Sequence, residues 1–200
     1  MDIRIEKGTV KGKIQAPPSK SYAHRMLICA ALASGNSIIH GISGSEDMLA
    51  TIDCICALGR NCVKAGSDVT LSGSSAGSSE TAPVFKCRES GSTLRFFIPI
   101  AMALTEGGTF CGSRRLIERG ITVYEEAFEN SKVSISTEPE QISISGRLAP
   151  GTYRIRGDVS SQFVSGLLFA LPLLEDDSDL YVIPPVESRA YIDITLDSMK

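Results

Sequence analysis

The chain has 200 residues, a formal net charge of −3, 42% hydrophobic residues and 22% charged residues. These values are normal for a soluble globular protein with a real core, and the acidic total argues against a nucleic-acid surface. No apolar run has membrane-spanning length and MDIRIEKG contains no signal-peptide core, so we expect a cytoplasmic protein without membrane contact.

The predicted elements follow one order that recurs along the chain. Apolar periodicity and Ser, Gly and Pro signals predict strands at 2–6 and 9–15, a helix from 19–21 to 32, a strand at 37–40, a helix at 45–58 and a hairpin of strands 61–64 and 69–71. After a Gly/Ser-rich linker at 72–79, we expect a strand at 84–87, a helix at 94–104, a strand at 109–111, a helix at 116–128 and strands at 133–136 and 141–145. A third round has a strand at 152–156, a helix at 163–174, a strand at 180–183 and a helix at 188–198.

The order β-α-β-α-β-β thus occurs twice in full and once without its last strand pair, with a period of about 70 residues. We therefore predict an α+β fold of repeated β-α-β-α-β-β units around buried parallel helices, with sheets outside. The units lie at about 9–72, 84–146 and 152–200. Because the third unit is incomplete, we expect the chain to be part of a longer protein.

Three of the predicted helices open on serine-rich turns, namely PSKSYAHR (18–25), ESGSTLR (89–95) and DVSSQF (158–163). A long apolar helix follows each turn and must be buried. Buried helices that run side by side would bring their N-termini to one end, where their partial positive charges add. Free N–H groups, hydroxyls, Lys20 and Arg25 would suit a phosphate or carboxylate there. For the first turn, an ordinary capped helix with solvated charges is the alternative.

Other polar side chains point to structural roles. The six cysteines and two histidines lack a metal-binding spacing, so we expect no metal, and we interpret the cysteines as reduced and mostly buried. We also expect no cofactor. His24 adjoins an apolar helix and is expected to pack or make a local hydrogen bond. Arg95, in the first turn of a helix, is interpreted as structural or generally electrostatic. Arg114 and Arg115 are expected to be solvated.

Five separated motifs together resemble the N-terminal half of the EPSP synthase (3-phosphoshikimate 1-carboxyvinyltransferase) family of enolpyruvyl transferases. They are PSKSYAHR, ESGSTLR, LIERG (116–120), GDVSSQF (157–163) and ESRAYI (187–192). The family transfers the enolpyruvyl group of phosphoenolpyruvate to the 5-hydroxyl of shikimate 3-phosphate and releases phosphate, in the shikimate pathway to chorismate and aromatic amino acids. Its active site lies between two lobes of an inside-out α/β fold. The resemblance implies that this chain is the N-terminal lobe, that the C-terminal lobe is absent from it, and that the full-length protein is a monomer.

The resemblance implies a role for individual residues. Lys20 is the residue expected to be catalytic, as proton carrier or electrostatic stabiliser. Arg25 would grip the carboxylate of shikimate 3-phosphate by a two-pronged contact, and Gly91 would let backbone N–H groups approach phosphoenolpyruvate. The residues implied for shikimate 3-phosphate are Lys20, Ser21, Arg25, Ser160, Ser161, Gln162, Ser188 and Tyr191. Those implied for phosphoenolpyruvate are Lys20, Gly91, Arg119 and Gln162.

The acidic catalytic groups of the family come from the second lobe, so we expect this chain alone to bind shikimate 3-phosphate weakly and to be inactive. One alternative is the sister enzyme that acts on UDP-N-acetylglucosamine, whose first motif has Lys-Asn where this chain has Lys20-Ser21. Another is a non-catalytic anion-binding domain of the same fold. Glu89 stands where many family members have Asn, so its carboxylate must pair with a cation or point away.

Overall fold

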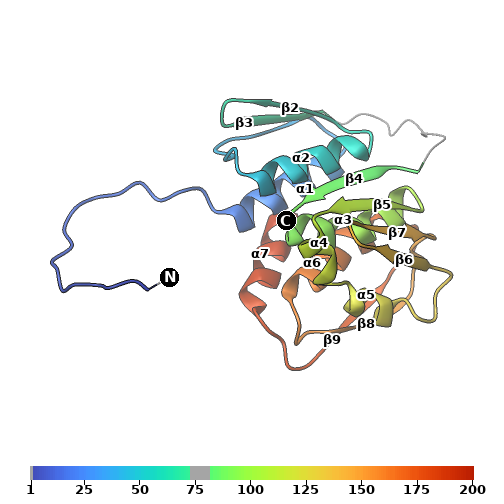
Figure 1. Cartoon of the computed structure of the whole chain (residues 1–200). Helices are drawn as coiled ribbons and strands as arrows, with labels where there is room; N and C mark the ends of the chain where they lie inside the picture. The colour runs from blue at the N-terminus through green and yellow to red at the C-terminus, as the bar shows by residue number, and fades with distance from the viewer. Residues whose placement is uncertain (1, 73–81) are drawn as a thin grey trace.

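The computed structural model describes residues 2–72 and 82–200 and has a mixed α+β fold (Figure 1). Its helices are α1 (Lys20–Leu32), α2 (Glu46–Ala57), α3 (Gly91–Leu104), α4 (Arg114–Glu118), α5 (Thr122–Ala127), α6 (Ser161–Ala170), the 3-10 helix η1 (Leu171–Leu173) and α7 (Arg189–Met199). Its strands are β1 (Ser37–Ile39), β2 (Asn61–Ala65), β3 (Asp68–Ser72), β4 (Val84–Arg88), β5 (Gly107–Gly112), β6 (Ser134–Glu138), β7 (Gln141–Ser145), β8 (Thr152–Arg156) and β9 (Asp179–Ile183). Apart from Ser72, the predicted linker lies outside the described residues. Within the described ranges, every helix is too short or too polar to cross a membrane.

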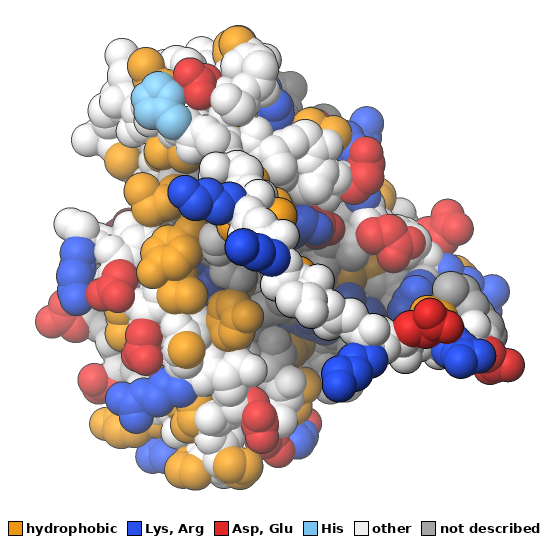
Figure 2. Space-filling view, turned by 90° about the vertical axis from the view of Figure 1, so that its left-hand side faces the viewer, with side chains coloured by type: hydrophobic (Ala, Val, Ile, Leu, Met, Phe, Trp, Pro, Cys, Tyr) orange, Lys and Arg blue, Asp and Glu red, His pale blue; other side chains and the backbone are white. Residues whose placement is uncertain are grey.

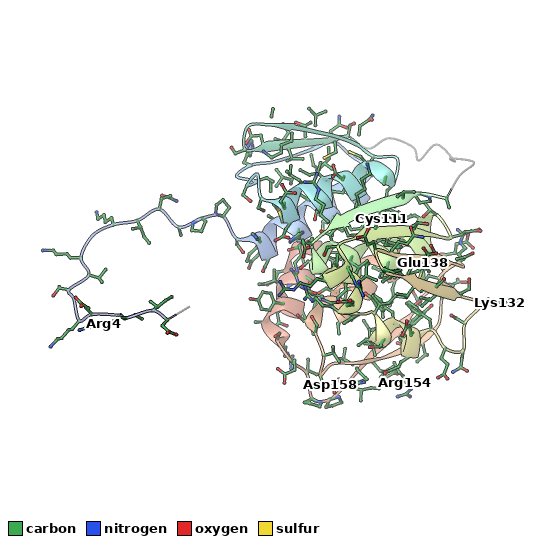
Figure 3. All side chains as sticks on the ribbon, in the orientation of Figure 1. Arg4, Cys111, Lys132, Glu138, Arg154 and Asp158 are labelled. Carbon is green, nitrogen blue, oxygen red and sulfur yellow. The ribbon has the colours of Figure 1, made fainter. Side chains whose placement is uncertain are left out.

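The N-terminal segment is extended and contains no strand, so the strands predicted at 2–6 and 9–15 are wrong. The segment leads away from the rest of the fold, and Arg4 lies on its outer part (Figures 1 and 3). Its apolar side chains Ile5 and Val10 are 90% and 101% exposed. Alternating apolar residues supply one face of a strand, but a strand also needs a neighbouring edge with which to form hydrogen bonds. None of the described strands pairs with this segment.

The described strands form three separate sheets. The first has the order β1-β3-β2 and is antiparallel throughout. The second has the order β4-β5-β7-β6, in which only β4 and β5 are parallel. The third is the parallel pair β8-β9. Buried residues alternate with more exposed ones along β3, β4 and β7, as at Phe85 and Cys87 in β4, so one face of the first two sheets covers the core.

Helices α3 and α6 form the centre of the core and pack directly on each other. Residues 93–103 of α3 are buried without interruption. The two helices approach closely at Gly166, where an added Cβ would lie 2.5 Å from the carbonyl oxygen of Arg95. The hydroxyl of Tyr124 lies 2.8 Å from that same oxygen and 3.0 Å from the carbonyl oxygen of Phe163. One phenol therefore bridges both helix backbones.

Three predicted helices differ from the observed ones. The helix expected at 94–104 begins three residues earlier, at Gly91. The helix expected at 116–128 is split into α4 and α5, because Gly120 has a φ of 69° and turns the chain between them. The helix expected at 163–174 begins earlier, at Ser161, and ends at Ala170. The chain then continues as η1, because Pro172 has no N–H to donate to the preceding turn.

Candidate functional site

The first two turns of four helices surround one polar cavity of about 270 Å³. The cavity is lined by Ser21 and Arg25 of α1, Ser92 and Phe96 of α3, Ser160, Ser161 and Gln162 at the start of α6, and Ser188 and Tyr191 at the start of α7. These include every residue that was predicted to contact shikimate 3-phosphate except Lys20. The structure thus brings together side chains that are up to 170 positions apart in the sequence.

Serine caps determine where three of these helices begin. The hydroxyl oxygens of Ser19, Ser90 and Ser160 accept hydrogen bonds from backbone N–H groups in the first turns of α1, α3 and α6, at 3.4, 3.2 and 3.3 Å. Ser188 precedes α7 with a φ of 56°, and its hydroxyl caps no N–H group. The remaining N–H groups of the four first turns carry partial positive charge at the edge of the cavity.

Arg25 is 3% exposed and is held from several sides. Its guanidinium donates to the Thr195 hydroxyl at 2.7 Å, to the carbonyl oxygens of Ser21 at 2.8 Å and Tyr191 at 3.0 Å, and to the Ser165 hydroxyl at 3.3 Å. A guanidinium has five N–H donors, so one is left for a ligand. The two-pronged carboxylate contact predicted for Arg25 therefore requires one of these bonds to be released. Burial lowers the pKa of Arg25, but an arginine side chain stays charged at neutral pH.

Gln162 connects the cavity to a second cationic group. Its side-chain oxygen accepts from Nη1 of Arg95 at 2.6 Å, and its amide nitrogen donates to the Ser92 hydroxyl at 2.8 Å. Arg95 is 6% exposed, and its guanidinium lies 4.8 Å from the centre of the Phe163 ring. Burial, and after it the like charge of Arg119, lower the pKa of Arg95. The structural or electrostatic role predicted for Arg95 therefore includes direct contact with a cavity residue.

Gly91 lies against these two arginines. A Cβ atom at Gly91 would lie 3.1 Å from Nη1 of Arg95 and 3.2 Å from Nη1 of Arg119. The side chain of glycine leaves that space open beside two positive charges and the start of α3. The structure therefore brings together Gly91 and Arg119, two of the residues that the resemblance assigns to phosphoenolpyruvate, although neither lines the cavity itself.

Lys20 and Glu89 lie outside the cavity. The ammonium group of Lys20 is exposed and forms an ion pair with Asp47 of α2 at 2.8 Å. A ligand contact by Lys20 therefore requires it to leave this partner. Glu89 is exposed, and within residues 2–72 and 82–200 it forms no ion pair. Of the two alternatives for Glu89, the structure thus favours a carboxylate that points to solvent.

The cavity is locally positive although the chain is acidic. None of the described residues that line it is acidic. Within the described ranges, Arg25, Arg95 and Arg119 have no carboxylate within ion-pair distance. On the face of the molecule in Figure 2, by contrast, basic and acidic side chains are interspersed. The arrangement therefore favours a ligand with several negative charges.

Two lining residues were missed by the sequence analysis. Ser92 lies in the ESGSTLR turn, which was treated as a loop but forms the first turn of α3. Phe96 lies four positions further on, on the same side of the helix, and the guanidinium of Arg25 lies 5.2 Å from its ring centre. A helix start at Gly91 instead of Leu94 would have predicted both, because positions four apart share one helix face.

The family model for EPSP synthase (3-phosphoshikimate 1-carboxyvinyltransferase) matches residues 5–200. The chain belongs to the EPSP synthase family. A 3-phosphoshikimate 1-carboxyvinyltransferase of Clostridium kluyveri is 44% identical over 199 residues, which are 98% of this chain and 46% of that protein. One from Clostridium perfringens is 40% identical over 200 residues, which are 99% of this chain and 47% of that protein.

A solved structure of EPSP synthase from Acinetobacter baumannii has the same fold over the matched part. It superimposes with a TM-score of 0.72 at 22% sequence identity, and covers 92% of this chain and 42% of the solved one. This EPSP synthase family chain thus spans about half the length of the curated relatives it matches.

Proposed function

We propose that this chain supplies the shikimate 3-phosphate side of an enzyme that transfers the enolpyruvyl group of phosphoenolpyruvate to the 5-hydroxyl of shikimate 3-phosphate, with release of phosphate. The single observation that carries the proposal is the cavity at which α1, α3, α6 and α7 begin. The cavity combines helix N-termini with Arg25 of α1 and with four serines at the starts of α1, α6 and α7. None of the described residues that line it is acidic. Such a set suits a ligand with a phosphate and a carboxylate.

Within the cavity, different residues would bind the phosphate and the carboxylate of shikimate 3-phosphate. Ser160, Ser161 and Ser188 would bind the phosphate, because their hydroxyls and the nearby N–H groups supply donors at two helix starts. Ser21 and the remaining N–H of Arg25 would bind the carboxylate, and Tyr191 would pack on the ring. The side chain of Ser161 forms no hydrogen bond within the described part of the chain, although Ser161 is 5% exposed, so its hydroxyl is free for a ligand.

Phosphoenolpyruvate would bind beside Gly91. Arg119 would pair with its charged groups there, and Gln162 would lie between the two substrates because it reaches from the cavity to Arg95 at 2.6 Å. Lys20 would contact both substrates after it leaves Asp47, and would carry a proton or stabilise developing charge. None of the described residues that line the cavity is acidic, so turnover would need an acid–base partner for Lys20 from a second lobe.

We further propose that the fold is one lobe of an inside-out α/β enolpyruvyl transferase, built from units at about 9–72, 84–146 and 152–200. The sheet orders support this. If β1, β2 and β3 correspond to β5, β6 and β7, then the order β1-β3-β2 of the first sheet is the same as the order β5-β7-β6 in the second sheet. The parallel pair β8-β9 likewise corresponds to the parallel pair β4-β5. The first unit would then lack its opening strand and the third its last strand pair. The other half of the relatives' length would supply the second lobe.

Thermal shift with two ligands tests the proposal. We expect shikimate 3-phosphate to raise the melting temperature of the chain, since a ligand at 100 times its Kd stabilises by about 2.7 kcal/mol. UDP-N-acetylglucosamine should leave the melting temperature unchanged. A shift with only the nucleotide sugar would favour the sister transferase, and a shift with inorganic phosphate alone would favour an anion-binding domain.

A matched pair of serine variants tests the site. Ser161→Ala removes a hydroxyl that makes no hydrogen bond within the described residues, so the free energy of unfolding should change little. We expect it to weaken shikimate 3-phosphate binding roughly tenfold, the effect of one hydrogen bond to a charged group. Ser136→Ala in β6, outside the cavity, is the control. Equal affinities of the two variants in a calorimetric titration would contradict the assignment.

The two substrates together test whether the chain can act alone. We expect no release of phosphate from shikimate 3-phosphate and phosphoenolpyruvate when this chain is the only protein present. Measurable release would show that the acid and base lie within these residues and would refute the proposed need for a second lobe.

A further inference from the structure

A chain of buried polar side chains connects α1, α2 and α3 behind the cavity. Nδ1 of His24 lies 2.7 Å from the hydroxyl oxygen of Thr51, which lies 2.9 Å from that of Thr93. Thr93 in turn donates to the hydroxyl oxygen of Ser90 at 2.7 Å. His24 and Ser90 are 4% and 3% exposed, and both threonines are fully buried. His24 was predicted to pack or to make a local hydrogen bond, but its partner Thr51 lies on another helix, so His24 is one end of a network between helices.

Each hydroxyl has a single hydrogen to donate, which limits the direction of the hydrogen bonds in this network. The single hydroxyl hydrogen of Thr93 goes to Ser90, so Thr93 can only accept from Thr51. The Thr51–Thr93 contact is then a hydrogen bond only if Thr51 donates its hydrogen to Thr93 and not to the carbonyl oxygen of Asp47 at 3.2 Å. In that arrangement Thr51 accepts from His24, whose proton lies on Nδ1, whereas a proton on Nε2 would make Thr51 the donor to His24 and leave the Thr51–Thr93 contact without a hydrogen. Burial lowers the pKa of His24 to about 4, so the ring is neutral at pH 7.

The network joins two helix starts that bear proposed ligand groups. His24 lies one turn beyond Lys20 and Ser21 in α1, while Ser90 caps α3 directly before Gly91 and Ser92. Thr51 of α2 is the link, because it bonds to a residue of each helix. When a fully buried hydroxyl loses a hydrogen bond, no water replaces the lost partner, so the folded state loses the full free energy of that bond. The spacing between the starts of α1 and α3 is therefore tied to one threonine hydroxyl.

We propose that Thr51 is a positioning residue for the substrate site: through His24 on one side and Thr93 and Ser90 on the other, it sets the position of the Gly91 turn relative to the start of α1. Its effect on ligands rests on the proposed function, whereas its effect on the Gly91 turn does not. Thr51 does not line the cavity, so it acts through the residues that it contacts.

Three variants of the 200-residue chain test this role. Thr51→Val keeps the shape and the β-branch but removes the hydroxyl, and Thr51→Ser keeps the hydroxyl. The control is Thr105→Val at the other end of α3, where the lost hydroxyl lies 2.9 Å from both the Ala101 and the Gly107 carbonyl oxygens. We expect the Kd for shikimate 3-phosphate or phosphoenolpyruvate to rise roughly tenfold in Thr51→Val and to stay near wild type in Thr51→Ser and Thr105→Val.

Nuclear magnetic resonance supplies a readout that needs no ligand. In the wild type we expect the ¹⁵N shifts of His24 to report a proton on Nδ1, and Thr51→Val should shift this tautomer and move the amide signals of Gly91 and Ser92. Thr105→Val should leave these signals unchanged. A wild-type His24 with its proton on Nε2, or Gly91 signals unmoved by Thr51→Val, would overturn the inference. Failure of the wild type to bind either substrate, with these signals as expected, would refute the proposed function and leave the positioning role intact.

Discussion

Arg25 joins α1 to the last described helix, and the variant Arg25→Met tests how much the fold depends on it. The guanidinium bonds to Thr195 and Tyr191 of α7 and to Ser165 of α6. Methionine keeps most of the apolar stem of the side chain, so the variant removes the charged group with little loss of volume. Arg25→Met therefore removes hydrogen bonds and a charge without leaving a cavity.

The size of the effect follows from opposing contributions. Four hydrogen bonds from a charged donor contribute roughly 1.5–3 kcal/mol each, or roughly 6–12 kcal/mol before other changes. The variant, however, no longer buries a charge, which regains several kcal/mol. The hydroxyls of Ser165 and Thr195, 2.7 Å apart, keep a bond to each other, and the carbonyl groups of Ser21 and Tyr191 belong to cavity residues that water can reach. We expect a net loss of about 3 kcal/mol in the free energy of unfolding.

Urea unfolding and hydrogen exchange together check this reasoning. The unfolding midpoint should fall, and amides of α7 should lose protection before those of α3, because α7 depends on Arg25 and α3 is buried on all sides. Arg115→Met in α4 is the control, since Arg115 is exposed and the change should stay within about 0.5 kcal/mol. A loss below about 1 kcal/mol for Arg25→Met, or equal loss of protection in both helices, would refute the assigned role.

Two further perturbations follow from buried groups. The pKa of His24 is about 4 in the folded chain and 6.5 in the unfolded chain, so its contribution to stability is complete above pH 6.5 and is lost as the pH falls towards 4. The free energy of unfolding falls by about 3 kcal/mol in total over this range. Unfolding measured from pH 7.5 to 4.5 should show a shallower decline for His24→Gln than for the wild type and the exposed-site control His40→Gln, and parallel curves would contradict this. Gly166→Ala should cost about 3 kcal/mol or more, because its Cβ would lie 2.5 Å from the Arg95 carbonyl oxygen in the core. Gly44→Ala, whose Cβ would meet no atom within 4 Å, is the control, and equal unfolding midpoints would refute the close contact of α3 and α6.

Local signals predicted the helices more reliably than the strands. Ser19 and Ser160 mark helix starts because a serine hydroxyl satisfies N–H groups a few residues away, whatever the rest of the chain does. The same logic should have divided the helix at 116–128, since Gly120 is a local stop signal that the apolar pattern of its neighbours obscured. The strands predicted at 2–6 and 9–15 failed because strand formation depends on a partner edge elsewhere in space.

Apart from the two N-terminal strands and the division of the helix at 116–128, the order of the elements was readable from the amino-acid sequence alone. The serine caps and the motifs that reveal the family were also readable, because each depends on residues within a few turns of one another. The tertiary structure alone decided which hydrogen-bond and ion-pair partners the site residues have. In the structure, Arg25 donates four of its N–H groups to other residues of the chain, Lys20 forms an ion pair with Asp47, and Arg95 donates a hydrogen bond to Gln162. Such bonds join residues that are distant in sequence, and their partners are set by how helices pack, which no local pattern of residues encodes.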